Sequence, residues 1–369
     1  MTPDYMAQAL GEARKGLGQT SPNPSVGAVI VKDGEVVGRG FHLYARRDHA
    51  EIVALAEAGE KARGATVYVT LEPCAHEGRT GPCVEALIAA GAGSVVVAME
   101  DPNPLVSGRG LARLRAAGIP VRVDAAYSAE AEALNEPFCF FMREHRPLVT
   151  LKSALTLDGK IAAPDDNEGW ITSDQARAHV QQLRHMTDAI VTGVGTVEAD
   201  DCSLTDRTGL PRSRPLLRIV VDSQLRVRPD SQMVRQGPKD LLIATTSAGN
   251  PDRRRALERE GVEIAVLDGP DGRTNLRALV ELLAGRKYQS LMIEAGSKVN
   301  GAALDAGIVD KIFFYYAPKM FGGLQSLPVA GGRGRRRRDD AMLFRDVRLH
   351  PMSRDEFAVE AWVVRGERA

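Results

Sequence analysis

The chain has 369 residues, of which 44% are hydrophobic and 26% charged, a composition typical of a globular protein of about two domains. Its 48 basic and 48 acidic residues give a formal net charge of zero, so charge gives no reason to expect a nucleic-acid partner. No apolar run approaches the roughly 18 residues of a membrane span, and the N-terminal residues lack the pattern of a secretory signal. Because the chain has only four cysteines, we expect a reduced, cytoplasmic protein rather than a disulfide framework.

The first part of the chain alternates helical and strand-like segments. Residues 4–16 carry apolar side chains at helical spacing, and Asp33-Gly34 between two strand-like runs, 26–32 and 35–40, indicates a hairpin. Further along we expect strands at 66–70, 94–98 and 119–123, and helices at 49–59, 82–90, 111–117 and 128–144. Strands that alternate with helices of about ten residues predict an α/β fold.

Arg146-Pro147 ends the last of these helices, and we place a domain boundary there. The alternation then restarts, with strands expected at 148–152, 189–192, 218–222, 240–244, 262–267, 290–294 and 311–316. Helices are expected at 173–186, 251–260, 274–284 and 297–306. The sequence therefore predicts two α/β domains, 1–146 and 147–369.

The first domain contains a candidate metal site in His49-Ala50-Glu51, Pro73-Cys74 and Gly81-Pro82-Cys83. A catalytic zinc site uses three protein ligands, commonly imidazole and thiolate, and leaves one position to a water whose pKa falls to about 7. His49, Cys74 and Cys83 supply such a set. Glu51 follows His49 in the same helical turn and is predicted to move protons from the water to the ring nitrogen and the departing amine. This order of residues is that of the zinc-dependent nucleobase deaminases.

Eight residues, 75–82, separate the two cysteines, whereas the generic deaminase motif has two. The insert is rich in turn formers and can loop out while both sulfurs reach one metal. Alternatively, the cysteines are ordinary buried thiols and His49 caps a helix, but their joint occurrence in this order favours zinc. Cys139 and Cys202 have no partner motif.

The sequence of the insert also indicates which family of zinc-dependent deaminases the first domain resembles. Pro73-Cys74-Ala75-His76-Glu77-Gly78-Arg79-Thr80, together with the motifs at 22–27 and 101–104, resembles the deaminase half of the bifunctional riboflavin-biosynthesis deaminase/reductases. The second domain resembles the reductase half of the same family, and the motifs that carry this likeness lie at 150–152, 157–160, 170–173, 195–201, 204–207, 222–223 and 300–307. The resemblance covers nearly the whole chain.

This resemblance implies a cytidine-deaminase-like N-terminal domain and a dihydrofolate-reductase-like C-terminal domain. The first would use zinc to deaminate 2,5-diamino-6-ribosylamino-4(3H)-pyrimidinone 5′-phosphate by hydrolysis. The second would use NADPH to reduce the ribosyl side chain, giving 5-amino-6-ribitylaminouracil 5′-phosphate. We therefore expect a small-molecule substrate, no nucleic-acid or membrane partner, and a homo-oligomer.

The resemblance also implies residue roles. In the first domain, His49, Cys74 and Cys83 become zinc ligands, Glu51 the catalytic residue and Asn23 a substrate contact, although Asn23 could equally be a turn residue between two prolines. In the second domain it implies a cofactor site of Ala154, Trp170, Thr196, Asp200, Ser223, Gly296, Ser297, Lys298, Val299, Asn300, Gly301 and Ala302. The substrate would contact Glu168, Arg184, Leu204, Arg207 and Glu294.

The residues themselves say less about the second site. No G-x-G-x-x-G opens a helix after a strand, so a Rossmann site is not expected. Two segments offer backbone amides suited to a phosphate: 193–196, which follows an expected strand, and 294–297, which ends a strand and starts a helix. At 193–196 a tight structural turn would look the same. Arginine suits a ribose phosphate because its planar fork binds two oxygens, but Arg184 could also be a solvated helix charge.

Two positions depart from the family pattern. Glu168 replaces a serine expected near substrate, in a stretch that also contains Asp165, Asp166 and Asn167, and Ala295 replaces a glycine that usually follows the glutamate. A carboxylate beside a phosphate weakens binding, and a methyl group could crowd the cofactor. The alternative interpretation is an active deaminase with an altered or inactive reductase half. We interpret the basic run 335–338, which is followed by two aspartates, as a solvated loop.

Overall fold

The computed structural model describes residues 3–76, 81–165 and 168–365, so residues 77–80 of the insert and Asp166 and Asn167 lie outside the described part. The chain forms two compact units: Met1–His145 with Pro211–Arg214, and Arg146–Leu210 with Pro215–Ala369. No helix in the described ranges is long and apolar enough to cross a membrane.

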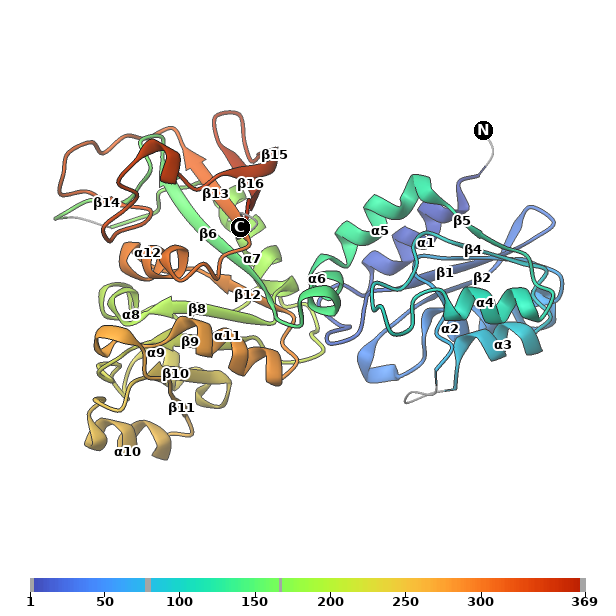
Figure 1. Cartoon of the computed structure of the whole chain (residues 1–369), viewed down its shortest axis with the longest axis horizontal. Helices are drawn as coiled ribbons and strands as arrows, with labels where there is room; N and C mark the ends of the chain where they lie inside the picture. Colours follow the sequence, from blue (N-terminus) through green and yellow to red (C-terminus); the bar gives the residue numbers. More distant parts are fainter. Residues whose placement is uncertain (1–2, 77–80, 166–167, 366–369) are drawn as a thin grey trace. The chain divides into compact units, whose positions relative to one another are not determined.

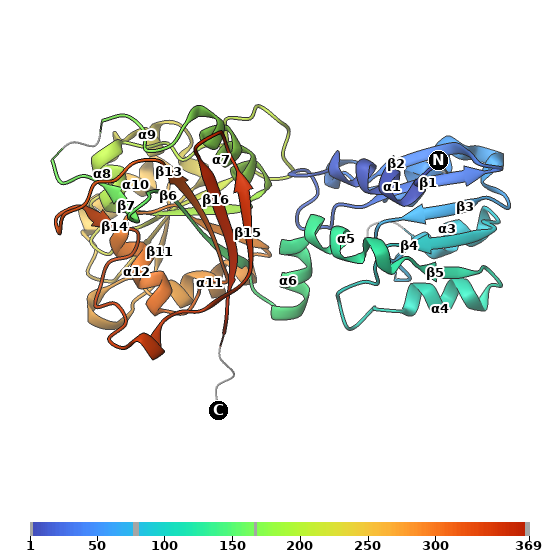
Figure 2. The same ribbon diagram turned by 90° about the horizontal axis from the view of Figure 1, so that it is seen from above.

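The described part of the first unit is built on a five-stranded sheet. Its order is β2 (Glu35–Phe41), β1 (Gly27–Lys32), β3 (Thr66–Val69), β4 (Ser94–Val97) and β5 (Val121–Val123), as Figure 2 shows. β1 is antiparallel to β2 and β3, whereas β3, β4 and β5 are parallel. The expected hairpin at Asp33-Gly34 is therefore confirmed.

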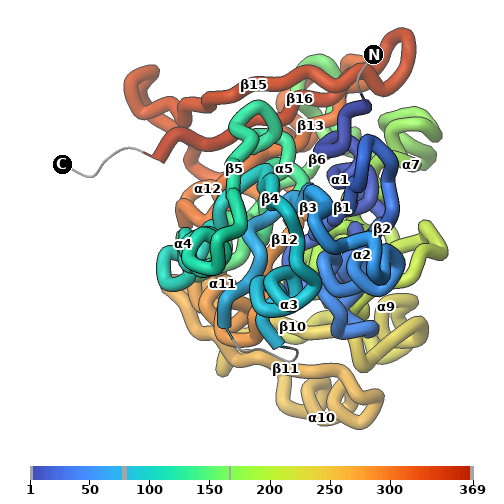
Figure 3. Tube along the Cα trace, turned by 90° about the vertical axis from the view of Figure 1, so that its right-hand side faces the viewer, coloured from blue at the N-terminus to red at the C-terminus, as the bar shows by residue number. Residues whose placement is uncertain are grey.

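The helices of this unit are α1 (Tyr5–Arg14), α2 (Ala50–Ala58), α3 (Cys83–Ala89), α4 (Arg109–Ala116), α5 (Ser128–Leu134) and α6 (Glu136–Glu144). Helices α2 and α3 lie side by side (Figure 3). α2 packs so closely on β2 that a Cβ atom on Gly40 would lie 2.1 Å from the backbone oxygen of Ala50. Glycine at this position therefore allows the start of α2 to lie against the sheet.

The expectation of one continuous helix over 128–144 is wrong. The chain leaves helical geometry at Asn135, with φ −112° and ψ 23°, between α5 and α6. The side chain of Asn135 is buried, accepts a hydrogen bond from the backbone N–H of Ser25 and donates one to the Ser25 carbonyl. This long-range pairing competes with continued helix and cannot be read from local spacing.

The described part of the second unit contains a nine-stranded sheet. Its order is β11 (Glu263–Val266), β10 (Leu241–Thr245), β9 (Leu217–Val221), β8 (Ala189–Gly193), β12 (Ser290–Ile293), β6 (Leu148–Thr156), β13 (Lys311–Ala317), β16 (Phe357–Val363) and β15 (Phe344–Pro351). The strands from β11 to β13 are parallel, and β16 and β15 complete the sheet in antiparallel pairing. The parallel strands therefore end at one common edge.

The helices around this sheet are α7 (Asp174–Met186), α8 (Val194–Asp200), α9 (Gln232–Arg235), α10 (Pro251–Arg259), α11 (Leu276–Gly285) and α12 (Ser297–Asp305). A small separate sheet pairs β7 (Lys160–Ala162) with β14 (Leu327–Pro328). Helices α8 and α12 lie at the same end of β8, its carboxyl end (Figure 1). The sequence analysis located the parallel strands and the longer helices but did not assign α8, α9, β7, β14, β15 or β16.

We predict that Gly40→Ala lowers the free energy of unfolding by about 2–3 kcal/mol, because the added methyl group would collide with the backbone of α2. The matched control is Gly11→Ala within α1, where no atom lies within 4 Å of the added Cβ. That substitution should raise stability by about 0.5–1 kcal/mol. Urea unfolding of the full chain measures both changes, and a Gly40→Ala protein as stable as the parent would contradict the packing argument.

Candidate active sites

Three potential metal ligands converge in the first unit. His49 is the N-cap residue of α2, Cys83 is the first residue of α3, and Cys74 lies in the loop after β3. The Nδ1 atom of His49 lies 3.1 Å from the sulfur of Cys83 and 3.5 Å from that of Cys74. All three ligand atoms lie within 4.8 Å of one another. Two helix starts and one loop thus bring together residues that lie up to 34 positions apart in the sequence.

This donor set fits zinc. Zinc–sulfur bonds of about 2.3 Å and zinc–nitrogen bonds of about 2.0 Å place tetrahedral ligand atoms roughly 3.3–3.8 Å apart. The two thiols also interact, because a hydrogen bond from Cys83 lowers the pKa of Cys74 to about 4 while the pKa of Cys83 is raised. The pair therefore carries a thiolate before any metal arrives, and thiolate is the form that binds metal.

Glu51 lies in the first turn of α2 and is buried beside these ligands. Burial raises the pKa of its carboxyl group to about 7. A carboxyl group with this pKa can both accept and release a proton near neutral pH, which is the property a general acid–base residue needs.

A histidine that the sequence analysis did not single out connects Asn23 to the ligand set. His42 is buried, and its Nδ1 atom donates a hydrogen bond to the Asp48 carbonyl at 2.9 Å. Its Nε2 atom lies 3.0 Å from the side-chain nitrogen of Asn23, and its ring packs edge-on against that of His49, with centroids 5.3 Å apart. The structure therefore brings Asn23 to the ligand set through His42, which no local motif marks.

Glu72 is a second residue that the motif search missed, although it directly precedes Pro73-Cys74. Its buried carboxylate accepts hydrogen bonds from the backbone N–H groups of Asp101, Gly108, Gly110 and Leu111. The distances are 2.8–3.3 Å. Glu72 thus ties the Cys74 loop to the segment 101–111, whose motif resembled the deaminase family.

In the second unit, Glu294 follows β12 and binds two cations. Its Oε1 atom accepts hydrogen bonds from Lys152 at 3.0 Å and from Arg184 at 2.7 Å, and its Oε2 atom accepts one from Nε of Arg184 at 3.1 Å. Burial alone would raise the pKa of Glu294, but the two cations outweigh it and lower the pKa to about 2. Lys152 was not among the expected site residues, although Thr150-Leu151-Lys152 is one of the segments that resemble the reductase half.

The expected cofactor residues gather partly at the carboxyl edge of the parallel strands. The run from Gly296 to Ala302 forms the N-cap and first turns of α12, and a Cβ on Gly296 would lie 3.5 Å from the Thr196 hydroxyl. Within the described ranges, the buried side-chain oxygens of Ser297 and Asn300 lack a hydrogen-bond partner. Such buried, unsatisfied groups at a helix N-terminus fit a bound cofactor.

The remaining expected residues lie elsewhere in this unit. The guanidinium of Arg177 lies 5.0 Å from the exposed ring of Trp170, and the Ser223 hydroxyl lies 3.0 Å from that of Thr274. Ala154 lies on β6, Asp200 ends α8 and Glu168 is exposed. Ala295 is partly buried and packs against the hydrophobic core.

Two family models match the chain. The RibD C-terminal domain matches residues 147–355, and the cytidine and deoxycytidylate deaminase zinc-binding region matches residues 2–99. Each model covers one of the two groups of residues described above.

Curated relatives and solved structures agree with these models. The chain is 46% identical over 339 residues to the riboflavin biosynthesis protein RibD of Escherichia coli, covering 88% of this chain and 90% of that protein. It is similar to the structure of Acinetobacter baumannii RibD, with a TM-score of 0.86, 34% identity and 98% coverage of both chains. A deaminase/reductase structure from Thermotoga maritima matches with a TM-score of 0.81, 34% identity and the same coverage.

We predict that Cys83→Ala reduces bound zinc from one equivalent per chain to well below one, since two ligands alone bind zinc weakly. Cys139→Ala is the matched control, because Cys139 is also a buried thiol of the first unit but is not one of the clustered residues. Elemental analysis of both purified proteins gives the stoichiometry. Full zinc content in Cys83→Ala would show that the cluster is not the metal site.

Proposed function

Because the chain belongs to the RibD family, the bifunctional deaminase/reductases of riboflavin biosynthesis, we propose roles for the individual residues of its two sites. The family, fold class, function and cofactors expected from the sequence are confirmed: a zinc-dependent deaminase domain is followed by an NADPH-dependent reductase domain. The domain boundary at 146/147 remains our proposal.

The convergence of His49, Cys74 and Cys83 beside buried Glu51 is the observation on which the deaminase assignment rests most directly. By analogy with the Thermotoga maritima protein, we assign diaminohydroxyphosphoribosylaminopyrimidine as the substrate. The three residues would hold zinc, which would supply a water made more acidic by the metal. Glu51 would take one proton from the attacking water and pass it to the ring nitrogen as the water oxygen bonds to the ring carbon. It would then pass the second water proton to the amine, which leaves as ammonia when its bond to the ring carbon breaks. Asn23, held by His42, contacts the pyrimidine.

The reductase assignment rests on the edge formed by β6, β12 and α12. We propose that residues 296–302, with Ala154, Trp170, Thr196, Asp200 and Ser223, bind NADPH, which supplies hydride. Lys152, which donates a hydrogen bond to Glu294, is the group that would donate a proton to the reduced substrate. Glu168, Leu204, Arg184 and Arg207 line the substrate side. The substrate is 5-amino-6-(5-phosphoribosylamino)uracil, again by analogy with the Thermotoga maritima protein.

The alternative of an inactive reductase half has no support. Ala295 is partly buried and packs against the hydrophobic core. Glu168 is exposed, and the ion-paired group of Lys152, Arg184 and Glu294 is assembled. We therefore propose that both halves are active.

We predict that Glu51→Gln lowers the deamination rate by about 10²–10⁴-fold, because the amide cannot move a proton. It should keep its zinc and reduce the deaminated intermediate at the parental rate. Glu57→Gln, on the exposed side of the same helix, is the control and should deaminate normally. Ammonia release measures the first reaction and NADPH absorbance the second; undiminished deamination in Glu51→Gln would exclude this residue as the proton shuttle.

We further propose that the enzyme is a cytoplasmic homo-oligomer. A reducing compartment keeps Cys74 and Cys83 available as metal ligands. β15 is an edge strand with exposed apolar side chains at Phe344, Val347 and Leu349, and such an edge favours pairing with another copy of the chain.

Replacing Val347 and Leu349 by lysine should convert the oligomer to smaller species, because charges oppose edge pairing. Val266→Lys at β11, the opposite edge strand of the sheet, is the matched control and should leave the mass unchanged. Light scattering of the purified proteins reports the mass. If the double variant keeps the parental mass, β15 does not form the interface.

A further inference from the structure

The loop formed by residues 203–208, which carries Leu204 and Arg207, has a strained backbone. Leu204 is buried and has φ of 50°, in the left-handed region that bulky residues rarely adopt. Such a conformation costs about 1–3 kcal/mol and persists only where surrounding contacts fix it. The loop is therefore held in place by other parts of the unit.

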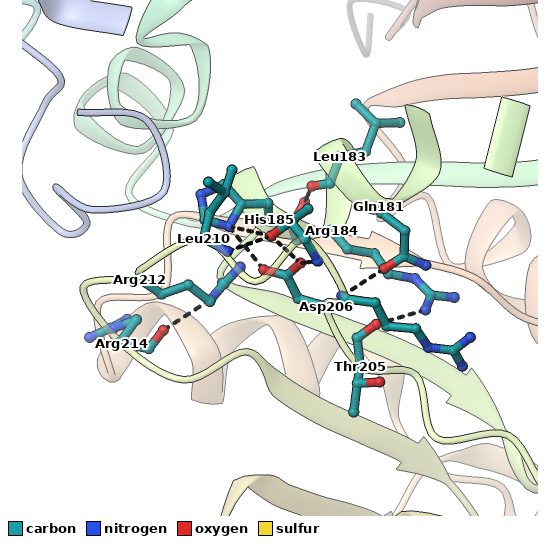
Figure 4. Close-up of polar contacts among 12 residues, drawn as sticks. Gln181, Leu183, Arg184, His185, Thr205, Asp206, Leu210, Arg212 and Arg214 are labelled. Atoms are coloured by element: carbon teal, nitrogen blue, oxygen red, sulfur yellow. Dashed lines mark hydrogen bonds and ion pairs between the residues drawn. The ribbon is translucent and has the colours of Figure 1, made fainter. Parts of the chain in front are cut away.

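Three side chains on one face of α7 make these contacts. Gln181, Arg184 and His185 are spaced three and four residues apart, so they lie on the same side of the helix. They hold three consecutive loop residues, as Figure 4 shows for the central contacts. Gln181 accepts a hydrogen bond from the backbone N–H of Arg207 at 2.9 Å, and Arg184 donates one to the Thr205 carbonyl at 3.0 Å.

The third contact joins two buried side chains. Nδ1 of His185 donates a hydrogen bond to Oδ2 of Asp206 at 2.9 Å, and the two side chains are 6% and 8% exposed. The other carboxylate oxygen of Asp206 accepts hydrogen bonds from the backbone N–H of Thr208 at 2.9 Å and from its hydroxyl at 2.8 Å. Asp206 thus fixes the backbone on the far side of Arg207, while Gln181 fixes Arg207 itself.

The two arginines of this region differ in availability. Arg184 is buried, and its guanidinium already binds both oxygens of Glu294 and the Thr205 carbonyl. Arg207 is exposed, and its contact with the Ser203 hydroxyl, at 3.3 Å, is a long one. The Arg207 guanidinium is therefore the one that can reorient to bind a phosphate, whereas Arg184 links the loop to Glu294.

We propose that Asp206 and His185 are positioning residues that hold the strained 203–208 loop so that Arg207 meets the 5′-phosphate of the reductase substrate. This inference rests on the proposed role of Arg207 as a substrate contact. The pair touches neither substrate nor cofactor. It acts on phosphate recognition, and hence on the preference of the second site for a phosphorylated over an unphosphorylated ribosyl chain.

The test uses the zinc-loaded full chain with saturating NADPH and two substrates: the deaminated intermediate, and the same compound without its 5′-phosphate. The ratio of their kcat/KM values measures phosphate recognition. Arg207→Ala should lower this ratio by about 100-fold, since charge-assisted hydrogen bonds to phosphate are lost. Asp206→Ala and His185→Ala should each lower it by about tenfold, chiefly through KM for the phosphorylated substrate.

Two combinations separate positioning from general damage. The Asp206→Ala/His185→Ala double variant should lose no more than Asp206→Ala alone, because His185 acts through the Asp206 carboxylate. Adding Asp206→Ala to Arg207→Ala should not lower the ratio further. Asp230→Ala, which removes an exposed carboxylate paired with Arg228, is the control and should leave the ratio unchanged.

The deaminase domain of the same chain and the affinity for NADPH serve as folding controls, and both should match the parent. The proposal is overturned if Asp206→Ala lowers kcat/KM equally for both substrates, leaves the ratio intact, or adds to Arg207→Ala. If Arg207→Ala itself leaves the ratio intact, the phosphate contact proposed for Arg207 fails, and the positioning role fails with it.

Discussion

Both sites depend on a helix start that is pressed onto neighbouring backbone where no Cβ atom can fit. In the first unit, Gly40 of β2 lies against the carbonyl of Ala50, and this contact sets where α2 begins and where His49 caps it. In the second unit, a Cβ on Gly301 would lie 2.1 Å from the Gly331 carbonyl, so α12 lies directly under the segment that follows β14. A helix start carries unpaired N–H groups and directs its first side chains at defined angles. The position of the helix start on the neighbouring backbone therefore determines what the site can bind.

The two units also use glutamates in opposite ways. Glu51 lies in a site where burial dominates, which raises its pKa to about 7 and makes it able to exchange protons. Glu294 is only partly buried, and Lys152 and Arg184 lower its pKa to about 2, so it stays ionised and binds the two cations. The same side chain thus becomes a proton carrier or a fixed charge according to its neighbours. Arg184 connects the ion-paired group of Glu294 and Lys152 to the 203–208 loop, because it also donates a hydrogen bond to the Thr205 carbonyl.

The clustering of His49, Cys74 and Cys83 beside Glu51 could be predicted because local motifs carry these residues. The parallel strands could be predicted because their apolar runs are bounded by clear turns. The residues that support them could not. His42, Glu72 and Lys152 act through partners 6 to 142 residues away, and no spacing rule connects such pairs. Asn135 breaks the helix expected over 128–144 because it pairs with Ser25, 110 positions away. β15 was missed because its side chains are mostly exposed, so the strand lacks the alternation that marks a half-buried strand.

The central claim is that one chain carries out deamination and reduction in sequence, and a single assay tests it. The purified, zinc-loaded chain is given the diaminopyrimidine substrate and NADPH, and ammonia release and nicotinamide absorbance are followed together. Two active sites predict that NADPH is consumed after a lag and in the same final amount as the ammonia released. Ammonia release without any loss of nicotinamide absorbance would contradict the claim.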